Sequence, residues 1–195
     1  MIVIADNDII HKLALCNLLE EFLAWLQVPP SEVWVLPTLK FWIRRKLKGN
    51  VAALSRFEKF LLLTAEIPVA SPASLEFFDS LDVGEQQLLS VFIEQPEPPR
   101  LVTGDKRAIR QLAELSQQNI LLSAKLEGQV DCLEGVMLEL IRLYGFDTIN
   151  SKIVPEADGL FRLVFGAGRT QEHANEALQS YLGELRRQSP FVISR

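Results

Sequence analysis

The chain has few of the residues that build disulfide frameworks, zinc sites or histidine-dependent active sites. Its 195 residues include only two cysteines and two histidines. Cys16 and Cys132 lie in apolar, helix-like segments and form no CxxC pair, so neither a disulfide framework nor a cysteine-type zinc site is expected. Neither His11 nor His173 has metal-ligand spacing to another histidine or cysteine. We therefore expect two small buried thiols in a reducing compartment.

The sequence also lacks long hydrophobic runs and nucleotide-binding loops. Its first apolar run ends at Asp6, and no run approaches the about 18 residues of a membrane-spanning helix. With no basic leader at the N-terminus, these features predict a soluble cytoplasmic protein. GxSxG, Walker and complete GxGxxG motifs do not occur, and Gly166-Ala167-Gly168 is interpreted as a turn.

Positive charge is scarce overall but concentrated in one segment. The formal net charge is −5, so the chain as a whole does not attract nucleic acid, although local patches decide binding. The largest basic segment runs from Lys40 to Lys48, with Phe41 and Trp42 inside it. Such a segment suits a single nucleic-acid strand; the alternative is an amphipathic helix with Phe41, Trp42 and Leu47 packed inside and its cations in solvent.

Short apolar runs alternate with helical patterns, which predicts an α/β fold with a mostly parallel sheet. Strands are predicted at 1–5, 33–36 and 100–103, with weaker candidates at 69–72, 119–123 and 160–165. Helices are predicted at 7–27, 38–48, 51–66, 73–79, 83–94, 105–117, 130–144 and 171–187. We expect one domain at 1–145 and a C-terminal extension at 146–195, packed on that domain or used for assembly.

Three acidic residues stand where this fold brings them to one edge. Asp6 and Asp105 each follow a strand-like run, and Glu85 opens a helical stretch. Ligands of such sheets bind beyond the carboxyl ends of the strands. Carboxylates gathered there repel each other unless a cation is present, so the pattern favours a divalent metal.

Helix capping is the competing explanation for each acid. Asp6 and Asp105 precede predicted helices, and Asp82 with Glu85 matches a capping box. Because a cap occurs at many helix starts, one acid in such a place indicates little. The combination of three, two of them after strands, carries the metal hypothesis.

The segments around these acids resemble the motifs of PIN-domain proteins. The stretch 5–14 is similar to the first motif of that family: a strand, an Asp, small polar residues and an apolar helix. Asp82-Val83-Gly84-Glu85 resembles the mid-chain motif, and Thr103-Gly104-Asp105-Lys106-Arg107-Ala108 resembles the third. The resemblance covers about residues 1–145 and leaves the last part of the chain unmatched.

This resemblance implies a PIN-like three-layer α/β/α sandwich and Mg²⁺- or Mn²⁺-dependent cleavage of RNA. Asp6, Glu85 and Asp105 match the catalytic, metal-holding acids. Weaker candidates for substrate binding are Asn7, Lys106, Arg107, Arg44 and Arg45. The family's fourth acid has no match in residues 106–111; Glu114, Glu127 and Asp131 are later candidates. Toxin-type members of the family also imply a homodimer and an antitoxin-like protein partner.

Two other functions compete with the ribonuclease hypothesis. A catalytically silent PIN-like binding or assembly module is favoured by the missing fourth acid and the acidic charge balance. Its partner surface would be the C-terminal extension. Asp6-Asn7-Asp8 also resembles the Asp-x-Asp motif of haloacid-dehalogenase-type phosphatases. Ile9-Ile10 and the lack of a second acid close after Asp105 disfavour that hypothesis.

Overall fold

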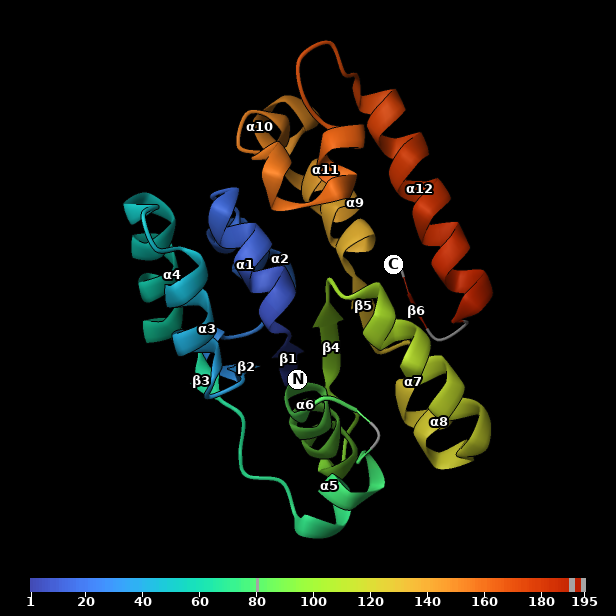
Figure 1. Ribbon diagram of the computed structural model, residues 1–195. Helices are drawn as coiled ribbons and strands as arrows, with labels where there is room; N and C mark the ends of the chain where they lie inside the picture. The colour runs from blue at the N-terminus through green and yellow to red at the C-terminus, as the bar shows by residue number, and fades with distance from the viewer. Residues whose placement is uncertain (80, 190–191, 194–195) are drawn as a thin grey trace.

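A parallel sheet forms the centre of the molecule (Figure 1). The computed structural model describes residues 1–79, 81–189 and 192–193. The strands are β1 (Val3–Ala5), β2 (Val33–Val35), β3 (Ala65–Glu66), β4 (Arg100–Thr103), β5 (Val130–Cys132) and β6 (Val192–Ile193). They form a six-stranded sheet in the order β3-β2-β1-β4-β5-β6, and every neighbouring pair is parallel. Strand β1 is wholly buried at the centre because both of its neighbours and both faces are covered.

Helices cover both faces of the sheet, giving the predicted three-layer α/β/α sandwich. The chain moves from β1 to β3 toward one edge, then crosses back to β4 and continues to the other edge. Right-handed crossovers in opposite directions place their helices on opposite faces. One layer contains α1 (Asn7–Leu15), α2 (Leu19–Leu26), α3 (Leu39–Lys46) and α4 (Val51–Leu63). The other contains α5 (Pro72–Phe77), α6 (Val83–Glu94), α7 (Lys106–Gln118) and α8 (Ile120–Leu126).

The C-terminal part of the chain belongs to the same folded body. It contains α10 (Phe146–Asn150), α11 (Gly159–Val164) and α12 (Gln171–Gln188), which follow α9 (Leu133–Tyr144). Helix α9 packs against α2, and α12 packs along α9 (Figure 1). The buried side chains of Leu178, Leu182 and Leu185 join the main hydrophobic core. Strand β6 then pairs with β5 and extends the sheet.

Several local predictions were wrong. The strand candidate at 119–123 is the start of α8, because the Asn119 side chain accepts a hydrogen bond from Leu122 N and caps a helix. The candidate at 160–165 is α11, which Asp158 caps in the same way. The candidate at 69–72 contains no strand; β3 lies earlier, inside the predicted helix 51–66. The predicted helix 7–27 is two helices, separated where Asn17 adopts the left-handed conformation with φ 53°.

Candidate functional site

The strand order creates a crevice between β1 and β4. Connections leave these adjacent strands toward opposite edges of the sheet, and such a switch point is where α/β proteins bind ligands. Asp6 directly follows β1, and Gly104-Asp105 directly follows β4. The structure therefore brings two of the predicted acids to the same switch point.

A hydrogen-bonded chain links these two strand ends. The Asp105 backbone N–H donates to Thr103 Oγ1 at 3.1 Å, and the Thr103 hydroxyl donates to Asp6 Oδ2 at 2.9 Å. Asp6 Oδ1 accepts from the Asn7 backbone N–H at 2.6 Å. Thr103 thus fixes the orientation of the Asp6 carboxylate. Sequence reasoning included Thr103 in the motif-like segment 103–108 but gave it no role, because the spacing does not show that its hydroxyl reaches Asp6.

Glu85 reaches the same region from the first turn of α6. It lines a cavity of about 30 Å³ together with Asp6 and Thr103, and leucines form most of the remaining wall. That volume is about the size of one water molecule and is too small for an organic ligand. Two of the predicted acids, Asp6 and Glu85, therefore line one small cavity, whereas Asp105 lies outside its lining.

The acids influence one another electrostatically. Burial raises the pKa of Asp6 to about 6 against the opposing hydrogen bonds of Thr103 and Asn7, and the charges of Asp8 and Asp105 raise it further. Burial also raises the pKa of Glu85, with contributions from Asp82, Asp105 and Asp6. In the described part of the chain, no ion pair compensates Asp6, Glu85 or Asp105.

The capping predictions are confirmed at the same time. Asp105 Oδ1 accepts from the N–H groups of Arg107 and Ala108, and Asp82 Oδ1 accepts from those of Gly84 and Glu85. Asp6 occupies the cap position of α1. Capping explains why acids stand at these helix starts. It does not explain why Asp6 is held in an environment that opposes its charge.

A buried lysine next to the site escaped the sequence analysis. Lys12 is 8% exposed and forms ion pairs with Asp8 and, at 2.7 Å, with Asp158 before α11. Burial alone would lower the pKa of Lys12. The charges and hydrogen bonds of Asp8 and Asp158 have the larger effect, so the pKa is raised overall. A Cβ on Gly104 would lie 2.6 Å from Asp8 Oδ2, so the ion pair packs directly against this glycine. Asp8 is therefore ion-paired, and its charge still raises the pKa of Asp6.

A fourth acid stands at the sheet edge, at a position the sequence analysis did not propose. Glu134 lies just after β5, is 1% exposed and forms an ion pair with Lys106 at 2.6 Å. It was overlooked because β5 was included in the predicted helix 130–144. Of the proposed alternatives, Glu114 and Glu127 are exposed, and Asp131 is buried in an ion pair with Arg100.

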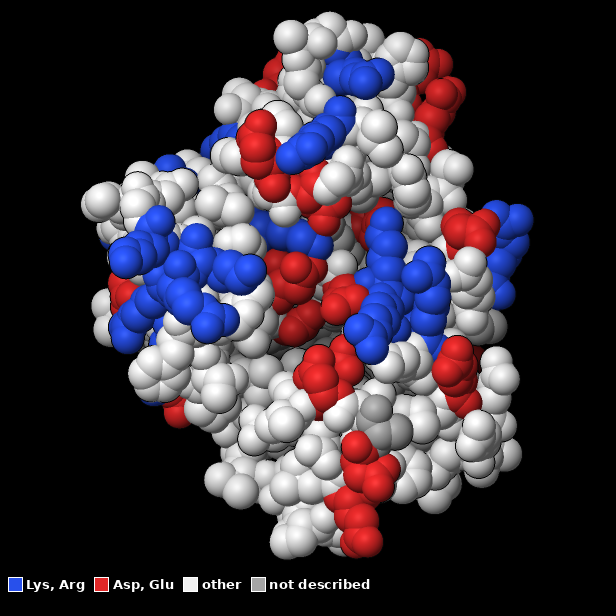
Figure 2. Space-filling view, in the orientation of Figure 1, with Lys and Arg blue, Asp and Glu red and all other residues white. Residues whose placement is uncertain are grey.

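Some of the predicted substrate-binding residues are held in ion pairs, and others have no partner in the described part of the chain. Arg44 forms a bidentate pair with Glu58, and Lys106 is engaged by Glu134. The side chains of Arg45 and Arg107 are exposed and have no partner among the described residues. Asn7 Oδ1 is buried without a hydrogen-bond partner in the same part of the chain. Figure 2 shows acidic side chains at the centre of this face, between basic side chains over α3 and over α7.

The donor set suits a hard cation, but it is not preassembled. In residues 1–79, 81–189 and 192–193, no three His, Cys, Asp or Glu side chains form a group that could hold a metal as placed. Mg²⁺ keeps several waters and commonly takes only one or two protein carboxylates. The uncompensated carboxylates and the unpartnered Asn7 oxygen thus fit a hydrated divalent cation in chemistry and charge.

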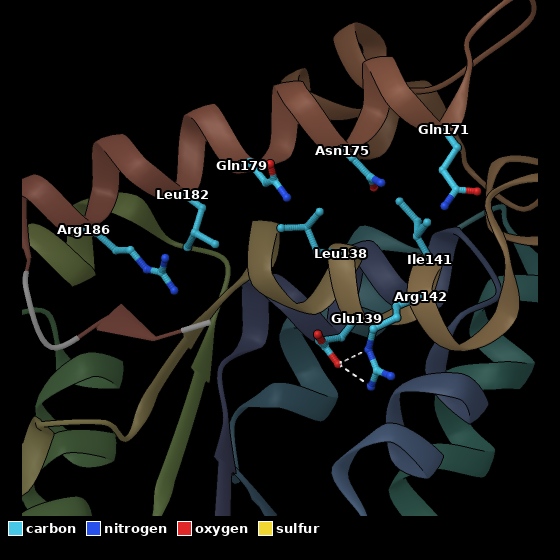
Figure 3. A pocket seen from close by; sticks show the side chains of 9 residues that line it. All are labelled: Leu138, Glu139, Ile141, Arg142, Gln171, Asn175, Gln179, Leu182 and Arg186. Atoms are coloured by element: carbon cyan, nitrogen blue, oxygen red, sulfur yellow. Dashed lines mark hydrogen bonds and ion pairs between the residues drawn. The ribbon is translucent and has the colours of Figure 1, made fainter. Parts of the chain in front are cut away.

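A larger groove lies elsewhere, between α9 and α12. Its volume is about 520 Å³, and Leu138, Ile141 and Leu182 form an apolar part of its lining. Gln171, Asn175 and Gln179 reach into it from α12, while the Glu139–Arg142 ion pair lies on the α9 side (Figure 3). None of the predicted site residues lines this groove.

Comparisons with known proteins identified no relative. The chain matched no family model, no curated protein and no solved structure. Of the helices in the described ranges, none has the length and apolar character needed to cross a membrane. A function for this chain therefore has to be inferred from its own residues.

Proposed function

We propose that this protein is a divalent-metal-dependent endoribonuclease of the PIN type, with Asp6, Glu85 and Asp105 holding Mg²⁺ or Mn²⁺. The observation that carries the proposal is that Asp6 and Asp105 lie uncompensated at the β1–β4 switch point, with Glu85 of α6 close enough for their charges to raise its pKa. One of them, Asp6, has its pKa raised to about 6. Such an arrangement is unfavourable in the absence of a cation and becomes favourable with one.

Each residue has a part in this proposal. A bound Mg²⁺ or Mn²⁺ would supply an activated water and stabilise charge on the scissile phosphate. Thr103 orients Asp6, and Lys12 neutralises Asp8 so that Asp8 adds less repulsion to the site. Arg107, exposed and unpaired in the described structure, is available to contact substrate phosphate.

A metal-binding measurement with matched variants tests the proposal. Asp6→Asn and Asp105→Asn keep a good capping residue, so both variants should fold. Asp147→Asn, an exposed acid at the start of α10, serves as the control. Titration calorimetry with Mn²⁺ should show binding by the wild type and the control and little by either site variant. Cleavage of a labelled RNA should follow the same order.

The alternative function is a silent binding module with the same fold, favoured by the net charge of −5 and by the lack of a fourth acid in residues 106–111. The two functions differ in the outcome of that experiment. If the wild type binds no Mn²⁺ and cleaves no RNA, the silent module replaces the nuclease. If both site variants cleave RNA at the wild-type rate, the assignment of Asp6 and Asp105 is wrong.

A further inference from the structure

Helix α3 exposes an aromatic ring where a purely structural helix would bury it. Leu39 and Ile43, with Leu47 just after the helix, are buried against the core, as an amphipathic helix requires. Phe41 is 66% exposed, so the expectation that it packs inside is wrong. Trp42 is only half-buried, with its ring edge-on to His11 at 5.4 Å between centroids. The Lys40 ammonium lies 5.5 Å from the centroid of the Phe41 ring, and most of the ring surface is still open to solvent.

The cations of α3 divide into engaged and free groups. Lys40 pairs with Glu66 at 2.8 Å, and Arg44 pairs with Glu58. Arg45 and Lys48 are exposed and have no ion-pair or hydrogen-bond partner in the described part of the protein. Arg45 stands at position i+4 from Phe41, so these two side chains share one face of α3, and Lys48 lies in the turn that follows the helix end at Lys46. The three residues Phe41, Arg45 and Lys48 are termed the α3 platform.

The α3 platform lies beside the acidic site. Helix α3 contacts α1 through the Trp42–His11 pair, and α1 begins directly after Asp6. On the opposite flank, α7 presents Arg107 and Arg110; Arg110 donates a hydrogen bond to the neutral Gln188 Oε1 and has no ion-pair partner among the described residues. Figure 2 shows this order across the surface: basic over α3, acidic in the middle, basic over α7.

We propose that the α3 platform binds single-stranded nucleic acid, with an unpaired base stacked on Phe41 and phosphates held by Arg45 and Lys48. Uncompensated cations attract the phosphate backbone, and an exposed ring accepts any base face. A duplex keeps its bases stacked on one another and cannot offer one to Phe41. Binding at the platform needs no metal. Only the continuation of the strand past the acids toward Arg107 rests on the proposed nuclease function.

The chemistry of the platform also fixes its selectivity. A phenyl ring and two long cations recognise stacking surface and phosphate, and no group among them is suited to read the 2′-hydroxyl. Unpaired RNA and unpaired DNA should therefore bind with similar affinity. The corresponding duplexes should bind much more weakly at the same salt concentration.

Fluorescence anisotropy in EDTA, with labelled oligo(U) and oligo(dT), tests the platform. Phe41→Ala should weaken binding by about tenfold, and Phe41→Trp should retain it, because one stacked base is lost or kept. Arg45→Ala with Lys48→Ala should weaken binding and lower the slope of log K against log salt by about one to two. Leu62→Ala, exposed on α4, and Arg169→Ala, exposed before α12, are controls that should match the wild type.

The outcomes separate the platform from the nuclease. Binding in EDTA that is lost in Phe41→Ala, together with no RNA cleavage by the wild type when Mn²⁺ is added, supports the platform and rejects the nuclease. Cleavage with undiminished binding in Phe41→Ala overturns the platform and leaves the nuclease standing. Equal affinity for single strands and duplexes, or no binding by the wild type, also overturns the platform. Because all substituted side chains are exposed, unchanged thermal unfolding should accompany every variant.

Discussion

Replacing Asp6 with asparagine should stabilise the metal-free protein at neutral pH, although it damages the proposed site. Burial raises the pKa of the Asp6 carboxyl from 3.8 to about 6. Between these values the folded state binds the proton more tightly than the unfolded state does. The stability that this proton provides is fully present below pH 3.8 and is lost as pH rises through about 6.

The size of the effect follows from the pKa shift. A shift of about two pKa units, at 1.36 kcal/mol each, corresponds to about 3 kcal/mol. Above pH 6, where Asp6 is ionised, the fold is less stable by about this amount. Asparagine carries no charge and keeps an oxygen for the Thr103 hydroxyl, but it loses about 0.3–1 kcal/mol of interaction with the α1 N-terminus. The net stabilisation at pH 7.5 is about 2 kcal/mol, or about 4–8 °C in Tm for a chain of this length.

Differential scanning calorimetry in EDTA at several pH values measures this directly. The variant should melt higher than the wild type at pH 7.5, and the difference should disappear near pH 3.5. At a concentration of 100 times Kd, Mn²⁺ should then raise the free energy of unfolding of the wild type by about 3 kcal/mol. The free energy of unfolding of the variant should be nearly unchanged. A variant that melts lower than the wild type at pH 7.5 would refute the electrostatic reasoning, because it would mean that ionised Asp6 is stabilising.

Two further variants test the packing beside the site. Gly104→Ala places a Cβ 2.6 Å from Asp8 Oδ2 and should destabilise the fold by about 1–3 kcal/mol, whereas Gly159→Ala has nothing within 4 Å and should be nearly neutral in urea unfolding. Lys12→Met leaves Asp8 and Asp158 without their cation and should cost about 1–3 kcal/mol at pH 7. Urea unfolding at pH 7 measures this loss, and an unchanged free energy of unfolding would mean that the two ion pairs contribute nothing to stability.

The fold was predictable where local and long-range signals agree. Apolar runs at β1 and β4 are followed by capped, periodic helices, so their type and place are evident from the sequence. Failures occurred where a strand is very short. Strand β5 spans only Val130–Cys132 and continues directly into α9, so helical periodicity masked it. The sheet position of such a segment is decided by its neighbour β4, which the local sequence does not contain.

The candidate site was predictable only in its charged, motif-bearing part. Asp6, Glu85 and Asp105 could be named because acids after strands or at helix starts are visible in one dimension. Lys12 could not be named, because one of its two partners, Asp158, lies in the distant C-terminal part of the chain. The other partner, Asp8, is four residues away and alone gives no sign that Lys12 is buried. Glu134 was missed together with its strand. Contacts between distant segments decide which charges are neutralised, and this cannot be read from spacing.

Capping and metal binding are not competing explanations in this architecture. In a parallel sheet, helices begin just beyond the carboxyl ends of the strands, so a residue that caps such a helix also faces the crevice. Helices α1, α6 and α7 all begin here, at Asp6, Asp82 and Asp105. Each helix N-terminus contributes about half a positive charge, less than the full negative charge of one carboxylate. Burial raises the pKa of Asp6 even though it caps α1, so the proposed divalent cation would supply the charge that the helix dipoles leave uncompensated.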